Sequence, residues 1–187
     1  MPKLILIRHS QSRQDPARPA GEWDLSEEGR RRCEPLAARM AGYQADVIVT
    51  SRERKALATG QAVAERLGLA CAAADDLHEH ERRTARYTSA ELFEQIIARF
   101  FERPDELVFG EETARQAGAR FERAVLRVLA QHPGRNVAIV SHGTVMSLFV
   151  SRRAGIAPLP LWRSLGMPAI IVMALPRLEL VEVVERI

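Results

Sequence analysis

Short runs of apolar residues alternate with longer amphipathic stretches along the chain. Runs without a polar interruption are typical of strands that are buried on both faces of a sheet. They predict strands at residues 3–7, 46–50, 136–141 and 169–174. Residues 69–77 and 178–184, whose apolar positions are interrupted by acidic residues, are also predicted to form strands. In the stretches between them, apolar positions recur on one helical face, which indicates helices packed against that sheet.

The predicted helices have recognisable first and last residues. Ser26 can cap a helix whose first turn contains Glu27 and Glu28, and Gly68 can end the next helix. Helices are expected from residue 26 onward and at residues 54–67, 89–102, 113–131 and 144–153. Strands separated by helices predict an α/β fold, a three-layer αβα sandwich with a largely parallel central sheet.

Residues from about 78–111 interrupt this alternation of strands and helices. They contain the amphipathic helix predicted at 89–102, which Pro104 would stop. The segment is long enough to form a lid over one end of the sheet and short for a second domain. We therefore expect residues 1–187 to form a single domain with this small lid insertion.

The composition of the 187-residue chain narrows the choice of functions. No apolar run approaches the ~18 residues of a membrane span, and the N-terminus lacks a signal-peptide layout, so we expect a cytoplasmic protein without a membrane partner. Arginines are interleaved with acidic residues and aromatic residues are few, which argues against a nucleic-acid partner. Cys33 and Cys71 lack the spacing of metal ligands and are expected to be free thiols.

Three of the predicted strands end in polar residues of related chemistry. These ends are Arg8-His9, then Thr50-Ser51-Arg52 with Arg54 and Lys55 in the next turn, and Ser141-His142-Gly143. Because the carboxyl ends of parallel strands meet at one edge of a sheet, we expect two imidazoles and several cations to line one pocket. Arginine matches phosphate oxygens and helix N-termini add amide donors, so the pocket is predicted to bind a phosphate.

The chain resembles the histidine phosphatase superfamily, the phosphoglycerate-mutase-like group, at three motifs. They are Ile7-Arg8-His9-Ser10, Ser51-Arg52-Glu53-Arg54-Lys55-Ala56-Leu57-Ala58-Thr59 and Ser141-His142-Gly143. They match a strand ending Arg-His-Gly, the pattern Ser-x-x-x-Arg-Ala-x-x-Thr, and a strand ending Ser-His-Gly. Weaker matches are Leu25–Gly29, Leu77–Glu79 and Gly110–Thr113. The resemblance spans nearly the whole chain and indicates a short single-domain branch.

The resemblance implies a metal-independent phosphatase that acts on phosphomonoesters through a phosphohistidine, with no cofactor. His9 would be the nucleophile, and Arg8 and His142 would hold the phosphoryl oxygens. Glu79 would protonate the leaving oxygen and then activate water. The His9 ring must be neutral, so its other nitrogen needs an acceptor, expected to be a backbone carbonyl. Burial raises the pKa of Glu79 while cations lower it, and the sequence leaves that balance open.

The second motif departs from the family at Lys55, where the pattern has arginine. Only Lys3 and Lys55 are lysines among the 27 basic residues, so this substitution is notable. Lys55 could bind phosphate as a point charge, or Arg52 or Arg54 could take its place. We expect Lys55, with Arg52 able to face the same site.

Two further positions near the motifs have alternative interpretations. Ser10, where the family usually has glycine or glutamate, could donate its hydroxyl to phosphate. If Glu79 is not the acid, Glu81 is the substitute.

The segment around Glu79 is unusually rich in histidine and arginine. His78 and His80 share one face of an extended segment and could contribute to a metal site, but no third ligand is evident. Residues that could instead meet an anionic substrate group beyond the transferred phosphate are His80, Arg82 and Arg83.

Two other functions fit the same fold: a non-catalytic phospholigand-binding or regulatory protein, and a phosphomutase. Simple anion binding needs no nucleophile, so the presence of both His9 and His142 argues against the first. A mutase must exclude water from its intermediate, which usually takes a larger lid. We therefore predict a small-molecule phosphorylated substrate, and a monomer or a homodimer.

Overall fold

A six-stranded sheet forms the centre of the computed structural model, which describes residues 1–85 and 87–187. Its strands are β1 (Lys3–Arg8), β2 (Val47–Thr50), β3 (Cys71–Ala73), β4 (Val137–Ser141), β5 (Ala169–Ala174) and β6 (Glu179–Val184). They lie in the order β3-β2-β4-β1-β5-β6, and the first four of these are parallel. Strand β5 is antiparallel to both of its neighbours, β1 and β6, and the other five strands all run in one direction, so the sheet is largely parallel, as predicted.

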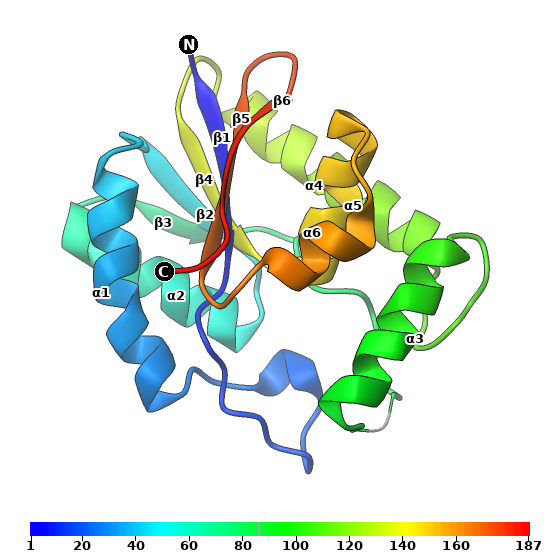
Figure 1. Ribbon diagram of the computed structural model, residues 1–187. Helices are drawn as coiled ribbons and strands as arrows, with labels where there is room; N and C mark the ends of the chain where they lie inside the picture. Colours follow the sequence, from blue (N-terminus) through cyan, green and yellow to red (C-terminus); the bar gives the residue numbers. More distant parts are fainter. Residues whose placement is uncertain (86) are drawn as a thin grey trace.

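The helices cover both faces of this sheet, as Figure 1 shows. They are η1 (Ala20–Glu22), α1 (Glu27–Ala41), α2 (Arg54–Leu67), α3 (Ala90–Glu102), α4 (Ala114–Gln131), α5 (Gly143–Ala154) and α6 (Pro158–Ser164). Helices α1 and α2 pack on one face, and α4 and α5 pack on the other. The three-layer αβα sandwich is therefore confirmed.

Strand β1 shows why the apolar run at the start of the chain is continuous. Leu4 and Leu6 pack on the α4–α5 side, whereas Ile5 and Ile7 pack on the α1–α2 side. This follows from the alternation of side chains along a strand. All four are fully buried, and each contributes about 2 kcal/mol by leaving water. The sequence thus fixes β1 in the middle of the sheet with its polar end, Arg8, at the rim.

The expected capping residues are confirmed. The Ser26 hydroxyl accepts a hydrogen bond from the Gly29 amide at 2.9 Å. Gly68 ends α2 with a φ of 65°, a left-handed conformation that suits glycine.

Three elements differ from the sequence-based expectation. The strand expected at 69–77 covers only Cys71–Ala73, because β2, its sole neighbour, ends at Thr50 and offers no further backbone partners. The short elements η1 and α6 were not predicted, since one or two turns are too brief to show a helical period.

The segment between β3 and α4 contains the predicted amphipathic helix as α3, capped by the Ser89 hydroxyl. Phe100 of α3 is fully buried against the α4–α5 layer, and Phe93 faces Trp162 of α6 with ring centroids 6.1 Å apart. Residue 86, within the lid predicted at 78–111, lies outside the described residues.

Both cysteines are free, as expected, although Cys71 on the edge strand is only partly buried. Within residues 1–85 and 87–187, none of the helices has the length and apolar character needed to cross a membrane.

Candidate active site

A cavity of about 930 Å³ lies at the carboxyl ends of the parallel strands. Its lining includes five predicted site residues: Arg8, His9, Lys55, Glu79 and His142. The register explains the meeting of the first and last motifs, because Arg8 of β1 pairs with Ser141 of β4. His9 and His142 follow directly, and their ring centroids lie 5.1 Å apart.

His9 is held as a neutral imidazole with one nitrogen free. Its Nδ1 lies 2.7 Å from the carbonyl oxygen of Ser10, so this nitrogen carries the proton and Nε2 keeps its lone pair. Burial, followed by the nearby His142, Lys55 and Arg8, holds the pKa of His9 well below its ordinary value. The ring is therefore an available nucleophile at neutral pH.

His142 immediately precedes the first residue of α5 and is fully buried. Its Nε2 lies 2.9 Å from the Ser51 hydroxyl, while Nδ1 has no hydrogen-bond partner among the described residues. Burial and the charge of Lys55 hold the pKa of His142 well below its ordinary value. Nδ1 is therefore the nitrogen left to meet a bound anion.

Arg8 presents its guanidinium beneath the first turn of α5. One terminal nitrogen donates to the Leu165 carbonyl, and Nε has no partner among the described residues. A Cβ at Gly143 would lie 3.0 Å from both Nε and Cζ of Arg8. The glycine of the Ser-His-Gly motif thus leaves room for this guanidinium.

Glu79 lies against the N-terminus of α5. Its carboxylate accepts hydrogen bonds from the backbone amides of Thr144 and Val145, each at 3.2 Å, and from that of His80 at 3.0 Å. Glu81 instead pairs with His78, 3.3 Å away, and is not among the residues that line the cavity. The geometry favours Glu79 over Glu81 as the acid–base group.

The balance that the sequence left open for Glu79 is resolved by these neighbours. Burial raises the pKa of the carboxyl, but His142, Arg82 and the amide hydrogen bond from His80 lower it by more. The pKa of Glu79 therefore lies below its ordinary value, and the free site holds a carboxylate at neutral pH.

Lys55 reaches the cavity with its ammonium bound on two sides. Its Nζ donates to the Ala20 carbonyl at 2.7 Å and to the Glu53 carboxylate. The other oxygen of Glu53 accepts the backbone amide of Glu79 at 2.9 Å and lies 3.6 Å from Nε2 of His142. Burial opposes ionisation of Glu53, but the charge and hydrogen bond of Lys55, together with the amide of Glu79, lower the pKa of Glu53 overall.

Glu53 was not predicted as a site residue. The available signal was an acid two positions before one of only two lysines in an arginine-rich chain. It connects the second motif to the segment that carries Glu79.

The structure places two of the predicted phosphate ligands, Arg52 and Ser10, outside the cavity lining. Arg52 is 64 % exposed, pairs with Asp75, and does not line the cavity. It precedes the first residue of α2, so helical spacing does not bring it beside Lys55. Ser10 is fully buried, and its hydroxyl donates to the Gly29 carbonyl at 2.7 Å, so it is not available to phosphate.

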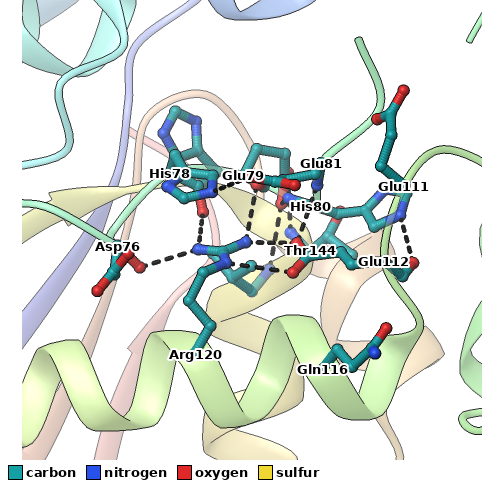
Figure 2. A network of polar contacts seen from close by, with 12 residues as sticks. Asp76, His78, Glu79, His80, Glu81, Glu111, Glu112, Gln116, Arg120 and Thr144 are labelled. Carbon is teal, nitrogen blue, oxygen red and sulfur yellow. Dashed lines mark hydrogen bonds and ion pairs between the residues drawn. The ribbon is translucent and has the colours of Figure 1, made fainter. Parts of the chain in front are cut away.

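Arg120 of α4 fixes the backbone around Glu79, as Figure 2 shows. Its guanidinium donates to the carbonyl oxygens of Asp76, His78 and Glu79 at 2.9, 3.0 and 3.0 Å. It also pairs at 2.5 Å with the Glu112 carboxylate, and both side chains are about nine-tenths buried. Backbone carbonyls of an irregular segment leave no sequence pattern, so this contact could not be predicted.

Glu112 and His80 complete this support. The Glu112 carboxylate accepts the amide of Glu81 at 2.9 Å, and its backbone carbonyl lies 3.0 Å from Nε2 of His80. The buried His80 ring packs on Phe100 and Phe109, with centroids 4.4 Å away in each case. His80 therefore packs within the fold and does not line the cavity. No cluster of three or more metal-ligating side chains occurs in the part of the chain that the structure describes.

Arg120→Lys should lower kcat by about 10- to 100-fold, because lysine keeps a charge beside Glu112 but cannot bond three carbonyls at once. The inhibition constant for inorganic phosphate should stay within about twofold, since Arg120 does not line the cavity. Steady-state kinetics test this, with the exposed Arg123→Lys on the same helix as the control. An unchanged kcat would remove Arg120 as a positioning residue.

The sheet carries a histidine pair and several cations at its carboxyl edge. This combination of fold and site is typical of histidine-based phosphate enzymes. The family model of the histidine phosphatase superfamily (branch 1) matches residues 4–175, and the chain belongs to this family. A search of curated proteins gave no match.

Solved structures share the fold at low sequence identity. Mycobacterial glucosyl-3-phosphoglycerate phosphatase with VO3 is 21 % identical, with a TM-score of 0.79 and 100 % of each chain covered. Entamoeba histolytica phosphoserine phosphatase with 3-phosphoglyceric acid is 19 % identical, with a TM-score of 0.79 over 98 % of this chain and 97 % of that one. Bacillus stearothermophilus YhfR is 19 % identical, with a TM-score of 0.78 over 99 % and 96 %.

Proposed function

We propose that this protein hydrolyses phosphomonoesters of small molecules in two steps, without a metal, through a phosphohistidine on His9. The observation that supports this most is the Nδ1 contact of His9 with the Ser10 carbonyl, which leaves Nε2 neutral and unprotonated in the cavity. The structural neighbours named as phosphatases of glucosyl-3-phosphoglycerate and phosphoserine support a small phosphorylated substrate. A cytoplasmic location and the choice between monomer and homodimer stay predictions.

In the first step, Nε2 of His9 attacks phosphorus and the ester P–O bond breaks. Arg8 and Lys55 offset the charge that spreads over the phosphoryl oxygens, and the neutral His142 ring contacts these oxygens through Nδ1. The leaving oxygen takes a proton from Glu79.

In the second step, Glu79 is a carboxylate and removes a proton from water. The resulting hydroxide attacks phosphorus, the P–N bond breaks, and His9 returns to its neutral form. The proton on Glu79 then passes to the departing phosphate, which restores the carboxylate. The low pKa of Glu79 in the free site suits this step. For the first step, the substrate monoanion supplies the proton, and the added negative charge of the phosphate raises the pKa of Glu79.

Lys55→Ala should weaken inhibition by inorganic phosphate by about tenfold, because a nearly buried cation of the phosphate site is lost. Lys55→Arg should retain or strengthen the inhibition by inorganic phosphate, because arginine can donate hydrogen bonds to two phosphate oxygens. The control is Lys3→Ala, since Lys3 begins β1 at the opposite end of the sheet. Unchanged phosphate inhibition in Lys55→Ala would remove Lys55 from the site.

The proposed function is tested by release of p-nitrophenol from its phosphate ester across pH 4–9 with EDTA present. We expect turnover that survives EDTA. Loss of activity in EDTA that added metal restores would contradict the metal-independent route. Absence of turnover at every pH, combined with tight phosphate binding, would favour the phospholigand-binding alternative.

A further inference from the structure

The cavity extends well beyond the space that a phosphate group needs, and aromatic side chains line its outer part. The chain has ten aromatic residues, and half of them line this one cavity. They are Trp23, Tyr87, Phe93, Phe109 and Trp162. A volume of about 930 Å³ lined in this way is typical of a site for an organic ligand.

The aromatic residues form two walls. In one wall, Trp23 and Tyr87 lie with ring centroids 6.4 Å apart. In the other, Phe93 lies 6.1 Å from Trp162 and 6.3 Å from Phe109. Although these rings could have filled the core, Tyr87 is 52 % exposed and the other four are only partly buried. Flat apolar surfaces that face a cavity favour a flat apolar guest.

The Trp23 wall is held in place by the loop that precedes it. The indole nitrogen of Trp23 donates to the carbonyl oxygens of Asp15 at 2.9 Å and Arg18 at 3.2 Å. The Tyr87 hydroxyl donates to the Gln14 side chain at 2.7 Å, which connects this loop to the lid segment.

Arg82 lies between the aromatic part of the cavity and its catalytic end. Its Cζ is 4.6 Å from the centroid of the Phe93 ring. Burial has the largest effect on the pKa of Glu79, which it raises, and on that of His142, which it lowers. The positive charge of Arg82 lowers both pKa values, so Arg82 is within electrostatic reach of the catalytic groups.

One nitrogen of Arg82, Nη1, is buried without a hydrogen-bond partner among the described residues. An unpaired buried donor is costly, and an anionic ligand group would satisfy it. Two other arginines of the cavity differ: Arg18 lies 3.5 Å from Asp15, and Arg83 lies 4.0 Å from Glu81.

We propose that this site takes phosphomonoesters whose organic part is a flat aromatic ring with a second anionic group, the ring lying between the two aromatic walls and the anion on Arg82. The inference rests on the proposed function for the position of the phosphate. It explains the outer cavity and the unpaired nitrogen of Arg82 together. The sequence had offered Arg82 as one of several candidates for such a contact, and the structure selects it.

Four non-hydrolysable probes test the inference by calorimetric binding, which does not require turnover. They are inorganic phosphate, propylphosphonate, benzylphosphonate and 4-(phosphonomethyl)benzoate. We expect benzylphosphonate to bind about tenfold more tightly than propylphosphonate, and the added carboxylate to give about tenfold more. Equal affinities for the three phosphonates would overturn the proposal.

Variants separate the two parts of this subsite. Arg82→Gln should remove the gain from the carboxylate while weakening the binding of inorganic phosphate far less. Trp162→Ala should reduce the gain from the ring and leave propylphosphonate unchanged. Arg99→Gln, an exposed charge change on α3 outside the cavity, is the control.

The outcomes distinguish this inference from the proposed function. If Arg82→Gln weakens inorganic phosphate as much as the carboxylate probe, Arg82 belongs to the phosphate site and the subsite is refuted. If the phosphonates bind in the expected order but p-nitrophenyl phosphate is not hydrolysed, the subsite stands and the hydrolytic function fails.

Discussion

His9→Ala should lower kcat for p-nitrophenyl phosphate by at least about 10⁴-fold. The variant keeps the phosphate site of Arg8, Lys55 and His142 but lacks the nitrogen that forms the bond to phosphorus. Because substrate binding does not need that nitrogen, the affinity for inorganic phosphate should change by less than about tenfold.

The matched control for this variant is His132→Ala. His132 follows α4 and precedes β4, so it lies at the opposite end of the sheet from the cavity. Both variants should keep the far-ultraviolet circular dichroism of the wild type. Turnover in His9→Ala within tenfold of the wild type, with a folded protein, would remove His9 as the nucleophile.

Glu79→Gln should lower kcat by about 10²- to 10⁴-fold, since both steps lose their proton-transfer group. The effect on kcat/KM should depend on the leaving group. An alkyl phosphate needs a proton on its leaving oxygen and should lose most of its kcat/KM. p-Nitrophenol leaves readily as an anion, so its kcat/KM should fall far less, while hydrolysis of the phosphoenzyme becomes slow.

Glu81→Gln is the matched control, because Glu81 is two positions away and does not line the cavity. It should keep kcat within about threefold. If Glu81→Gln abolished turnover and Glu79→Gln did not, the acid–base assignment would be reversed.

The pH profile of kcat/KM for an alkyl phosphate should decline as the pH rises above about 6, where a phosphate monoester loses its second proton. The pKa of Glu79 is below its ordinary value, so the free enzyme contributes a carboxylate and the monoanionic substrate contributes the proton. The pKa of His9 is also well below its ordinary value, so the nucleophile stays neutral in mildly acidic solution. An alkaline optimum would contradict this scheme.

The fold could be predicted because its four central strands, β1, β2, β4 and β5, are buried on both faces. An unbroken run such as Leu4–Ile7 carries that information locally. The length of β3 depends instead on where β2 ends, which is a tertiary property. The short helix α6 has no period long enough to be seen in sequence.

The meeting of Arg8, His9 and His142 in one cavity could be predicted from their positions at the ends of strands, because parallel strands bring their carboxyl ends together. Ser10 and Arg52 lie inside the motifs but do not line the cavity, because the direction of each side chain depends on its own partners, the Gly29 carbonyl and Asp75.

Glu53 and Arg120 were missed for a different reason. Each acts through backbone groups and ion pairs between segments that are distant in sequence. Glu53 holds Lys55 and the Glu79 amide, and Arg120 holds the carbonyls around Glu79. The sequence thus predicted the groups proposed to touch phosphate better than the groups that position them.

The most direct test of the central claim is to trap the phosphoenzyme. The enzyme is mixed with a phosphomonoester carrying a radiolabelled phosphoryl group and quenched in alkali within milliseconds. We predict a protein-bound label that is stable in alkali and lost in acid, as expected for phosphohistidine. It should be strongest in Glu79→Gln and absent from His9→Ala. A label that persists in His9→Ala, or turnover without any trapped label in Glu79→Gln, would contradict the account.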